Sequence, residues 1–538
     1  MEQQKMQTHA GPPMVFAMPM MRDFVPKPLR PWIYVVFAFC FQLGGGLYLG
    51  AINEIISTRQ FLLEDVLMCL YCNLAGMAVY FPLLFRMKFH FPNKVLLLGA
   101  SVGLIVSNIG AAYAPNLPML WLFCIISGFC KIQGTFECMS NIQLWMTPKR
   151  DFRVFFPLLH IFILGAMQVS DYLAAQIAYT SAWENMHWLM SGIYMTIAIV
   201  LIIITKAVYI MPPVPLKGID WISALLWLAF LLQWAFFFCY GQTLDWLHSA
   251  SMRTVGIAAI ATSILIVVRM LWLKQPYIDP QIWRVKHFLP ILSIITIAEI
   301  CFASEHVLEE VFYEHGLESA DHVAARLDWW SFMGVVIGCL FALLWMKVCD
   351  FSKLRLVTIA FFALAAYLII FYNIISSALN IESLRLPLML RSMAAAIMSI
   401  ALMTLLHDIF TFQTFFMALS IFNMIHMVIG GVVGAAFYSY GLNYFIADYI
   451  SRFSQSFDHI SMSVENIPFA FKMDRFSQTV MLVSIKQLYG IVAYVCLSVG
   501  MLLLLYKLPL RRGFKRMQSW NEVGKRMLKR MSRQEKKA

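Results

Sequence analysis

Long apolar runs alternate with short polar connections along almost the whole chain of 538 residues. A helix needs about 20 mostly apolar residues to cross the hydrocarbon core of a bilayer. The pattern predicts fourteen such spans, at about 32–53, 65–85, 95–114, 118–146, 154–179, 187–209, 219–240, 253–273, 288–311, 328–347, 354–375, 386–407, 412–440 and 483–506. The connections between them are too short for a separate soluble domain, so we expect an all-α polytopic membrane protein.

The distribution of basic residues tests this count. If the N-terminus lies inside, the inner connections and the two tails carry 31 of the 41 Lys and Arg residues. Basic residues of the outer connections are few: Arg59, Arg253, Arg326, Arg385, Arg452, Lys472 and Arg475. Cytoplasmic connections are enriched in Lys and Arg. The asymmetry therefore predicts an even number of spans with both termini in the cytoplasm, in the cell (inner) membrane.

Composition and charge narrow the class further. Hydrophobic residues make up 61% of the chain and charged residues 13%, which excludes a soluble enzyme or a disordered chain. The eleven cysteines lie mostly inside apolar runs without regular spacing, so we expect neither a disulfide framework nor a metal site. The net charge of +12 comes mainly from the tail 507–538, which suits the anionic inner face of a membrane rather than nucleic acid.

The connection after the seventh span carries the most specific motif. It reads Tyr240-Gly241-Gln242-Thr243-Leu244-Asp245-Trp246 and resembles the Gly-Gln-x-x-x-Trp segment of the fourteen-span drug:proton antiporters of the major facilitator superfamily, the EmrB/QacA type. Other residues agree with that family in order along the chain: Gln133-Gly134, Trp183, Trp188, Asp220-Trp221, Pro276, Asp279, Arg391, Gly430, Gly431 and Gly434. The resemblance covers most of the sequence.

This resemblance implies the major facilitator fold, with two six-helix bundles and two inserted helices. The expected organisation is a cytoplasmic N-terminal segment at 1–31, a six-helix bundle at 32–209, two inserted helices at 219–273, a second six-helix bundle at 288–506 with a long outer loop at 441–482, and a basic cytoplasmic tail at 507–538. The two bundles would rock about a central cavity.

Few ionisable residues fall inside the predicted spans, and a charge there usually faces a partner or a wet cavity. They are Lys131, Glu137, Asp171, Glu299, Arg391 and Lys486. Burial raises the pKa of a carboxylic acid and a nearby cation lowers it, so a carboxyl group that exchanges its cation partner can take up and release a proton. We expect Asp171 and Glu137 to carry protons, with Lys131 as the cation. Lys131 lies about 600° around the helix from Glu137, so Asp171 is its better partner. The alternative is a static ion pair between spans 4 and 5.

The ninth span offers a second set. Glu299, His306 and Glu310 are seven and four residues apart and fall on one helix face, where they could conduct protons. Alternatively, His306 and Glu310 belong to a solvated outer end with Glu305, Glu309 and Glu314. Arg391 either faces the cavity or fixes the outer end of span 12. Small residues that allow close helix packing occur in spans 1 and 13, at Gly44, Gly45, Gly46, Gly430, Gly431 and Gly434.

The leading functional hypothesis is a proton-driven exporter of amphipathic or hydrophobic small molecules, without a cofactor. The resemblance also implies a periplasmic adaptor and an outer-membrane channel as partners if the source has two membranes. A transporter of a specific metabolite, lipid or siderophore is the alternative. A polytopic membrane enzyme is less favoured, because the twelve histidines do not form the close clusters that a di-iron site requires.

Overall fold

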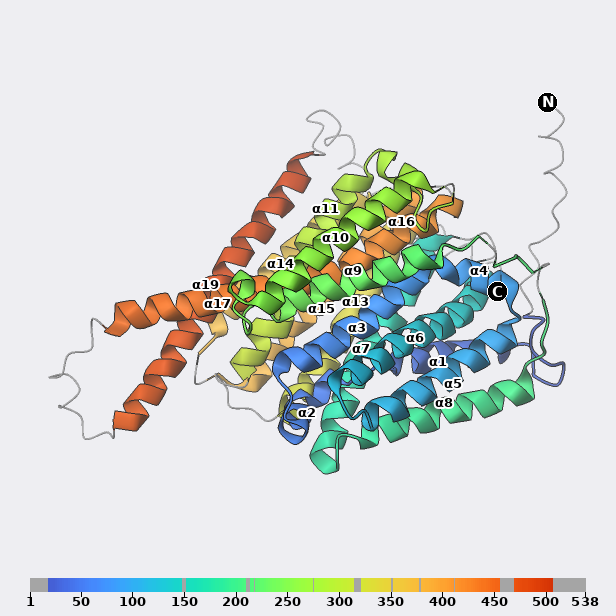
Figure 1. Cartoon of the computed structure of the whole chain (residues 1–538). Helices are drawn as coiled ribbons and strands as arrows, with labels where there is room; N and C mark the ends of the chain where they lie inside the picture. The colour runs from blue at the N-terminus through green and yellow to red at the C-terminus, as the bar shows by residue number, and fades with distance from the viewer. Residues whose placement is uncertain are drawn as a thin grey trace, which may run out of the picture.

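The structure is a computed structural model that describes residues 18–147, 151–209, 213–216, 218–273, 275–313, 321–349, 352–376, 379–410, 412–454 and 469–506. Within these ranges the chain is helical (Figure 1), and the β-pairing found there is one isolated bridge between Met21 and Thr205. The predicted all-α fold class is confirmed. The predicted basic tail 507–538 and residues 1–17 lie outside the described residues.

Long helices form the first region of the chain. In its described part they are α1 (Arg30–Leu43), α3 (Leu63–Tyr80), α5 (Asn93–Ala112), α6 (Leu117–Met146), α7 (Phe152–Thr180) and α8 (Asn185–Ile204). Short elements extend two of them: η2 (Leu49–Ala51) and α2 (Ile52–Arg59) follow α1, and η3 (Phe81–Leu83) and α4 (Leu84–His90) continue α3. Asn116 starts α6 because its side chain accepts a hydrogen bond from the Met119 amide at 3.1 Å. Within this first region, α6 packs against α1, α3 and α5.

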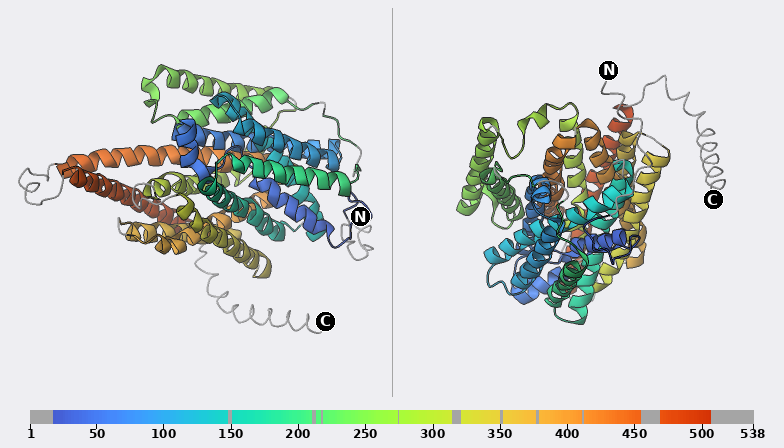
Figure 2. Two further views of the ribbon diagram at one scale, coloured as in Figure 1. Left: turned by 90° about the horizontal axis from the view of Figure 1, so that it is seen from below. Right: turned by 90° about the vertical axis from the view of Figure 1, so that its right-hand side faces the viewer.

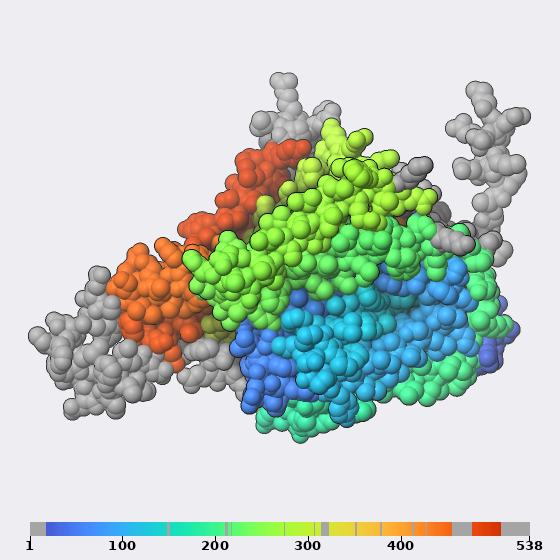
Figure 3. All heavy atoms as spheres, viewed as in Figure 1, coloured from blue at the N-terminus to red at the C-terminus, as the bar shows by residue number. Residues whose placement is uncertain are grey.

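The helices α9 (Trp221–Cys239) and α10 (Ala250–Trp272) form a hairpin at one side of the body (Figure 2), connected by the turn η4 (Trp246–His248). Only 22% and 17% of their most apolar windows are buried, the smallest shares among the candidate spans of the described residues. Arg269 holds the hairpin together through its 2.8 Å ion pair with Asp220, which caps α9. Figure 3 shows the pair, in green, on the surface beside the helices of the first region. These are the two helices that the sequence interpretation places between the bundles.

The second region continues with further long helices. In its described part they are α11 (Phe288–Phe302), α13 (Asp328–Leu343), α14 (Lys353–Ile374), α15 (Arg385–Ile409), α16 (Phe412–Met424), α17 (Gly430–Ser454) and α19 (Phe469–Tyr506). Short elements connect them: η5 (Pro280–Arg284), η6 (Glu305–Glu309), α12 (Asp321–Ala324), η8 (Ala325–Leu327), η9 (Leu344–Val348), η10 (Ile381–Leu384) and η11 (Ile425–Ile429). The helix α15 packs against α13 and α14, and α19 packs against α14 and α17. Both α17 and α19 extend into the predicted outer loop 441–482.

The two regions meet along two lines of contact. Helix α7 packs against α13 and α15, while α3 packs against α16 and the π-helical turn η11. The boundary between the regions therefore runs between helices that are far apart in the sequence, as the views in Figures 1 and 2 agree.

Twelve helices in the described part of the chain are long and apolar enough to cross a membrane. The other two predicted spans, 32–53 and 412–440, fall on interrupted helices. Helix α1 stops at Leu43 after 14 residues, and α16 gives way to η11 before α17 begins. An apolar run predicts the length of a span but not a break within it. The total of fourteen spans therefore stays a prediction.

Several of the glycines singled out from the sequence lie where helices approach closely. A Cβ atom on Gly44 would overlap the Tyr194 hydroxyl, and one on Gly46 would overlap Cys124 of α6. In α17, a Cβ on Gly430 would overlap Glu299, and one on Gly434 would overlap Ala303. By contrast, Gly45 approaches only its own chain segment, and Gly431 has open space at the Cβ position.

A close crossing of α3 and α6 depends on two glycines that sequence reasoning did not select. Gly128 of α6 lies against the backbone of α3 at Asn73, and Gly76 of α3 lies against the backbone of α6 at Ile125. Backbone atoms cannot move aside as a flexible side chain can. The two helices therefore approach at a distance that only a residue without a Cβ atom permits.

Replacing Gly128 with alanine is expected to destabilise the protein by about 1–3 kcal/mol, because the added methyl group overlaps the α3 backbone. Gly192→Ala is the matched control, since Gly192 lies in α8 with open space at its Cβ position. There alanine should raise stability slightly through its higher helix propensity. Thermal unfolding of both variants in detergent would test this, and equal midpoints would contradict the close crossing.

Candidate functional site

The first helix of each region is interrupted. Helix α1 ends at Leu43, and residues 44–48 are not helical before η2 and α2 continue the chain. Helix α11 ends at Phe302, and two turn residues separate it from the π-helical turn η6. Interrupted helices at corresponding positions in two halves are a feature of transporter binding sites, because the broken backbone there lines a cavity. The segments after both breaks contribute to one cavity in this structure.

This outer cavity has a volume of about 320 Å³ and lies at the end where the predicted outer connections meet. Its walls come from α2, α3, the end of α9, η6 and α17, so both regions and one helix of the α9–α10 hairpin line it. Among its lining residues are two carboxylates, Glu64 and Glu310, and no Lys or Arg of the described residues. Four aromatic side chains also line it: Tyr71, Phe238, Trp246 and Tyr313. Neutral polar side chains line it as well: Asn53, Gln242, Ser439 and Asn443. The cavity thus combines apolar, polar and negatively charged groups, a lining that suits an amphipathic molecule.

A buried charge cluster adjoins the outer cavity. Arg391 of α15 is 5% exposed and contacts both Glu305, at 2.8 Å, and Glu309 of the turn η6. Glu309 is 3% exposed and also accepts hydrogen bonds from Tyr367 and, at 3.3 Å, from Tyr313. Because Tyr313 lines the outer cavity, it connects the charge cluster to the cavity. A second hydroxyl group, that of Tyr489, lies 3.4 Å from the Tyr367 hydroxyl.

The cluster corrects one interpretation of the ninth span. One alternative from the sequence placed Glu305 and Glu309 at a solvated outer end. Arg391 from another helix pairs with both, and Glu309 is buried there, whereas Glu305 stays partly exposed. The turn η6 divides its side chains between two environments: Glu305 and Glu309 face Arg391, while Val307 and the adjoining Glu310 line the outer cavity. π-Helical turns inside α-helices occur often at functional sites. The sequence offered no signal that singles out Glu309, because Glu310 follows it directly and Glu305 lies four residues before it.

The predicted acidic stripe on span 9 is also broken. Glu299 pairs with His426 of η11, whose Nδ1 lies 2.7 Å from Glu299 Oε1, whereas Glu310 lines the outer cavity. The two acids do not share a face because the helix stops at Phe302 and η6 restarts with a different phase. His306 belongs to η6, and its side chain lies outside the described residues.

Lys131 and Asp171 do not come into direct contact as an ion pair, although each lies near enough to act electrostatically on the other. Within the described part of the chain, neither side chain makes a hydrogen bond or an ion pair, although Lys131 is buried and Asp171 is half-buried. The reason is the packing: α1 contacts both α6 and α7, which barely touch each other. Gly50 of η2 lies directly against the α7 backbone at Asp171.

Glu137 pairs with a lysine that the sequence interpretation did not select as its partner. Lys88 Nζ lies 3.0 Å from Glu137 Oε1, and Asn93 donates a second hydrogen bond to the same oxygen at 2.6 Å. Lys88 also donates a hydrogen bond to Ser140 at 2.6 Å. The sequence interpretation left Lys88 in a connection, but α4 continues α3 and places the lysine beside α6. Glu137 is therefore part of a buried ion pair near the inner end of the helices.

Aromatic side chains contact each other across the boundary between the two regions, at the end predicted to lie inside. The rings of Phe85 and Phe416 lie 4.0 Å apart, and Phe415 lies 6.2 Å from Phe152 of α7. An ion pair of 2.6 Å between Asp151 and Lys347 crosses the same boundary. Burial alone would raise the pKa of the Asp151 carboxyl group, but its hydrogen bonds to Lys347 and Arg153 lower that pKa below its usual value. The ionised pair thus favours contact between the inner ends at neutral pH.

Comparison with solved structures defines the fold. One similar structure is a mutant of the nucleoside transporter NupG. The alignment covers 87% of this chain and 99% of the NupG chain, at 11% sequence identity and a TM-score of 0.54. Another is the human organic anion transporter MFSD10 (TETRAN). The alignment covers 89% of this chain and 100% of the MFSD10 chain, also at 11% identity and a TM-score of 0.54. No family model matches the sequence, and no curated protein matches it.

The chain is thus an all-α membrane protein with the major facilitator fold, as predicted. The narrower assignment to the fourteen-span drug:proton antiporters stays a prediction that rests on the motifs in the sequence.

Proposed function

We propose that this protein is a secondary active transporter that moves amphipathic or hydrophobic small molecules by alternating access. The observation that carries the proposal is the outer cavity, which both regions line while aromatic contacts close the inner end of the same boundary. Alternating access needs a site between two halves that opens to one side at a time. The likeness in fold to a nucleoside transporter and an organic anion transporter supports this function.

Proton-driven export is the form of transport that we propose. Ionisable residues inside a membrane commonly belong to proton pathways, where they pair with one another. The cluster of Arg391, Glu305 and Glu309 has this composition and reaches the outer cavity through Tyr313. Protonation of Glu309 would leave Arg391 with Glu305 as its single carboxylate partner among the described residues. Glu309 is therefore our first candidate for the proton carrier, and Asp171 is the second.

The expected architecture in the cell follows from the same proposal. The segments 32–209 and 288–506 would act as the two rocking bundles, with both termini in the cytoplasm and the outer cavity on the opposite face of the inner membrane. A periplasmic adaptor and an outer-membrane channel would complete export in a cell with two membranes. These partners are supported by the resemblance of the sequence motifs.

Transport by purified protein in proteoliposomes tests the function. A fluorescent amphipathic dye is added under an imposed pH gradient, and the internal pH is followed with a trapped indicator. We expect the dye to move against its concentration gradient only when the pH gradient is present, with protons moving in the opposite direction. Protein-free liposomes are the control for leakage.

The possible outcomes separate the parts of the proposal. Uphill dye movement driven by a sodium gradient alone would contradict proton coupling but retain transport. No movement above the protein-free control, for a panel of amphipathic cations, anions and neutral compounds, would refute the transporter proposal for these substrates.

A further inference from the structure

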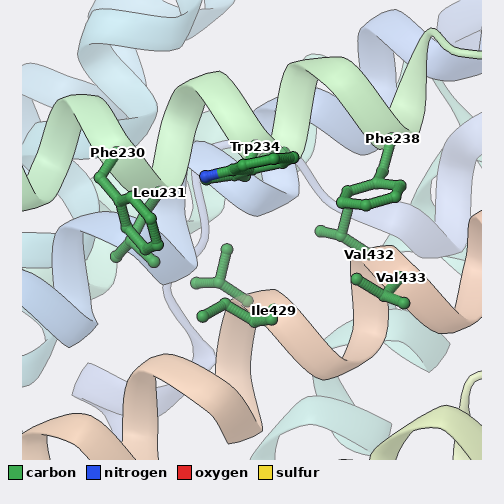
Figure 4. Close-up of a pocket in the computed structure, with 9 residues that line it drawn as sticks. Phe230, Leu231, Trp234, Phe238, Ile429, Val432 and Val433 are labelled. Carbon is green, nitrogen blue, oxygen red and sulfur yellow. The ribbon is translucent and has the colours of Figure 1, made fainter. Parts of the chain in front are cut away.

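A second cavity lies between the inserted helix α9 and the helix α17 of the second region. Its volume is about 160 Å³, and every lining side chain is hydrophobic. Figure 4 shows Phe230, Trp234 and Phe238 on one helix facing Ile429 and Val432 on the other. An apolar cavity of about 150 Å³ is large enough to bind benzene in another protein. A ring of that size, or a chain of about six carbons, would fit here.

This apolar cavity adjoins the outer cavity. Phe238 and Val432 line both of them, so the two cavities are neighbours that share part of their walls. The two cavities differ in chemistry: the apolar cavity has no polar lining group among the described residues apart from the indole of Trp234, whereas Glu64 and Glu310 belong to the outer cavity. The pair is thus complementary to a molecule with one apolar group and one positively charged head.

The walls of the apolar cavity belong to different parts of the structure. Helix α9 is fixed to α3 at its outer end, where Tyr240 donates a hydrogen bond to Asp65 and Thr243 donates one to Glu64. Beyond α10, Tyr277 donates a hydrogen bond to the carbonyl oxygen of Val79, also in α3. The opposite wall, η11 and α17, packs against α11 and, through α17, against α19. Movement between the two regions would therefore change the cavity.

We propose that the apolar cavity between α9 and α17 binds the apolar group of the transported amphiphile, while its amine head occupies the outer cavity. This inference rests on the proposed transport function and assigns the inserted helix α9 a part in substrate binding. A ligand in this position contacts both moving regions, so its binding would depend on the conformational state. The substrate class is then an amine with one apolar group of about six carbons.

Binding of a homologous series of amines tests the assignment directly. Radiolabelled n-alkylamines from ethyl to octyl are equilibrated with the wild-type protein in lipid nanodiscs, and binding to empty nanodiscs is subtracted. We expect the affinity to rise by up to about fourfold for each added methylene group until about six carbons, and then to level off. Ethylamine, which is too short to enter the apolar cavity from the outer one, provides the baseline.

Two variants fill the cavity from opposite walls. Ala235→Phe projects from α9 and Val433→Phe from α17, both among the lining residues. Each should lower the affinity for hexylamine by about tenfold or more and leave that for ethylamine unchanged, since roughly two or more methylene groups lose their site. Leu225→Phe is the matched control, because Leu225 is on the same helix α9 but 67% exposed. It should leave the whole series unchanged.

The failure of this inference differs from the failure of the transport proposal. Two results would overturn the assignment even if dye transport is observed. One is a wild-type affinity that does not depend on chain length. The other is an equal loss of affinity for ethylamine and hexylamine in both filled variants. The first result is also the one expected if membrane lipid occupies the cavity. A chain-length dependence that both filled variants abolish would support the assignment even if no uphill transport is found.

Discussion

Replacing Glu309 with glutamine is expected to abolish proton-coupled transport while the protein still folds and binds its substrate. Glutamine has nearly the same shape: its single amide oxygen can still accept the hydrogen bond from Arg391, and its amide nitrogen can donate to the Tyr367 hydroxyl, which contacts the other carboxylate oxygen in the native protein. It cannot exchange a proton. Because intramembrane acids of this kind form the proton pathways of transporters, we expect substrate-driven proton movement to fall by about tenfold or more. Proteoliposomes with a trapped pH indicator would measure it.

The control is another glutamate with an arginine partner. Glu382 lies 2.7 Å from Arg385, but both side chains are substantially exposed, so Glu382→Gln should leave coupled transport unchanged. Substrate binding measured in parallel separates coupling from affinity: Glu309→Gln should change the dissociation constant far less than the proton movement. Full coupling in Glu309→Gln would show that the cluster around Arg391 is structural, and Asp171→Asn would then be the next variant to assay.

Fold class was accessible from the sequence because the bilayer imposes a simple rule. A spanning helix must be long and apolar, and basic residues collect on one side, so runs and charges suffice to place the helices. Each of the fourteen predicted segments coincides with helical structure, even where α1 and α16 are interrupted. The breaks themselves were not predictable. Residues 44–48 contain three glycines, but glycine in a membrane helix is equally compatible with close packing.

Charge partners were harder to predict because they depend on how helices pack. Lys88 was not recognised as the partner of Glu137, because it reaches Glu137 only through the continuation of α3 into α4. Glu309 was interpreted as solvated since its neighbours in the sequence include other acids. Only the approach of α15, which is distant in sequence, places Arg391 beside it. The sequence could therefore select Arg391 as a candidate but not its partners.

The arrangement links the candidate substrate site to the candidate proton site through one short element. The turn η6 contributes Val307 to the outer cavity, beside the adjoining Glu310, and Glu305 and Glu309 to the charge cluster. A substrate that displaces η6 would change the distance between Glu309 and Arg391, and protonation of Glu309 would in turn change the position of η6. Coupling between two ligands requires such an element. It has two arrangements, and the binding of each ligand shifts the equilibrium between them.

Replacing Arg391 with methionine is expected to have the largest effect on stability, a loss of about 3–5 kcal/mol, because it leaves the buried Glu309 and the partly exposed Glu305 without their cation. Arg385→Met, six residues earlier in the same helix α15, is the control: its ion pair with Glu382 is exposed, and such pairs contribute only about 0–1 kcal/mol. Unfolding in detergent would measure both.

The double variant Arg391→Met/Glu309→Gln should recover part of the loss, since one uncompensated charge is removed with the arginine. If the loss in free energy of unfolding of the double variant equals the sum of the losses of the two single variants, Arg391 and Glu309 do not interact energetically. The pair would then not link η6 to α15.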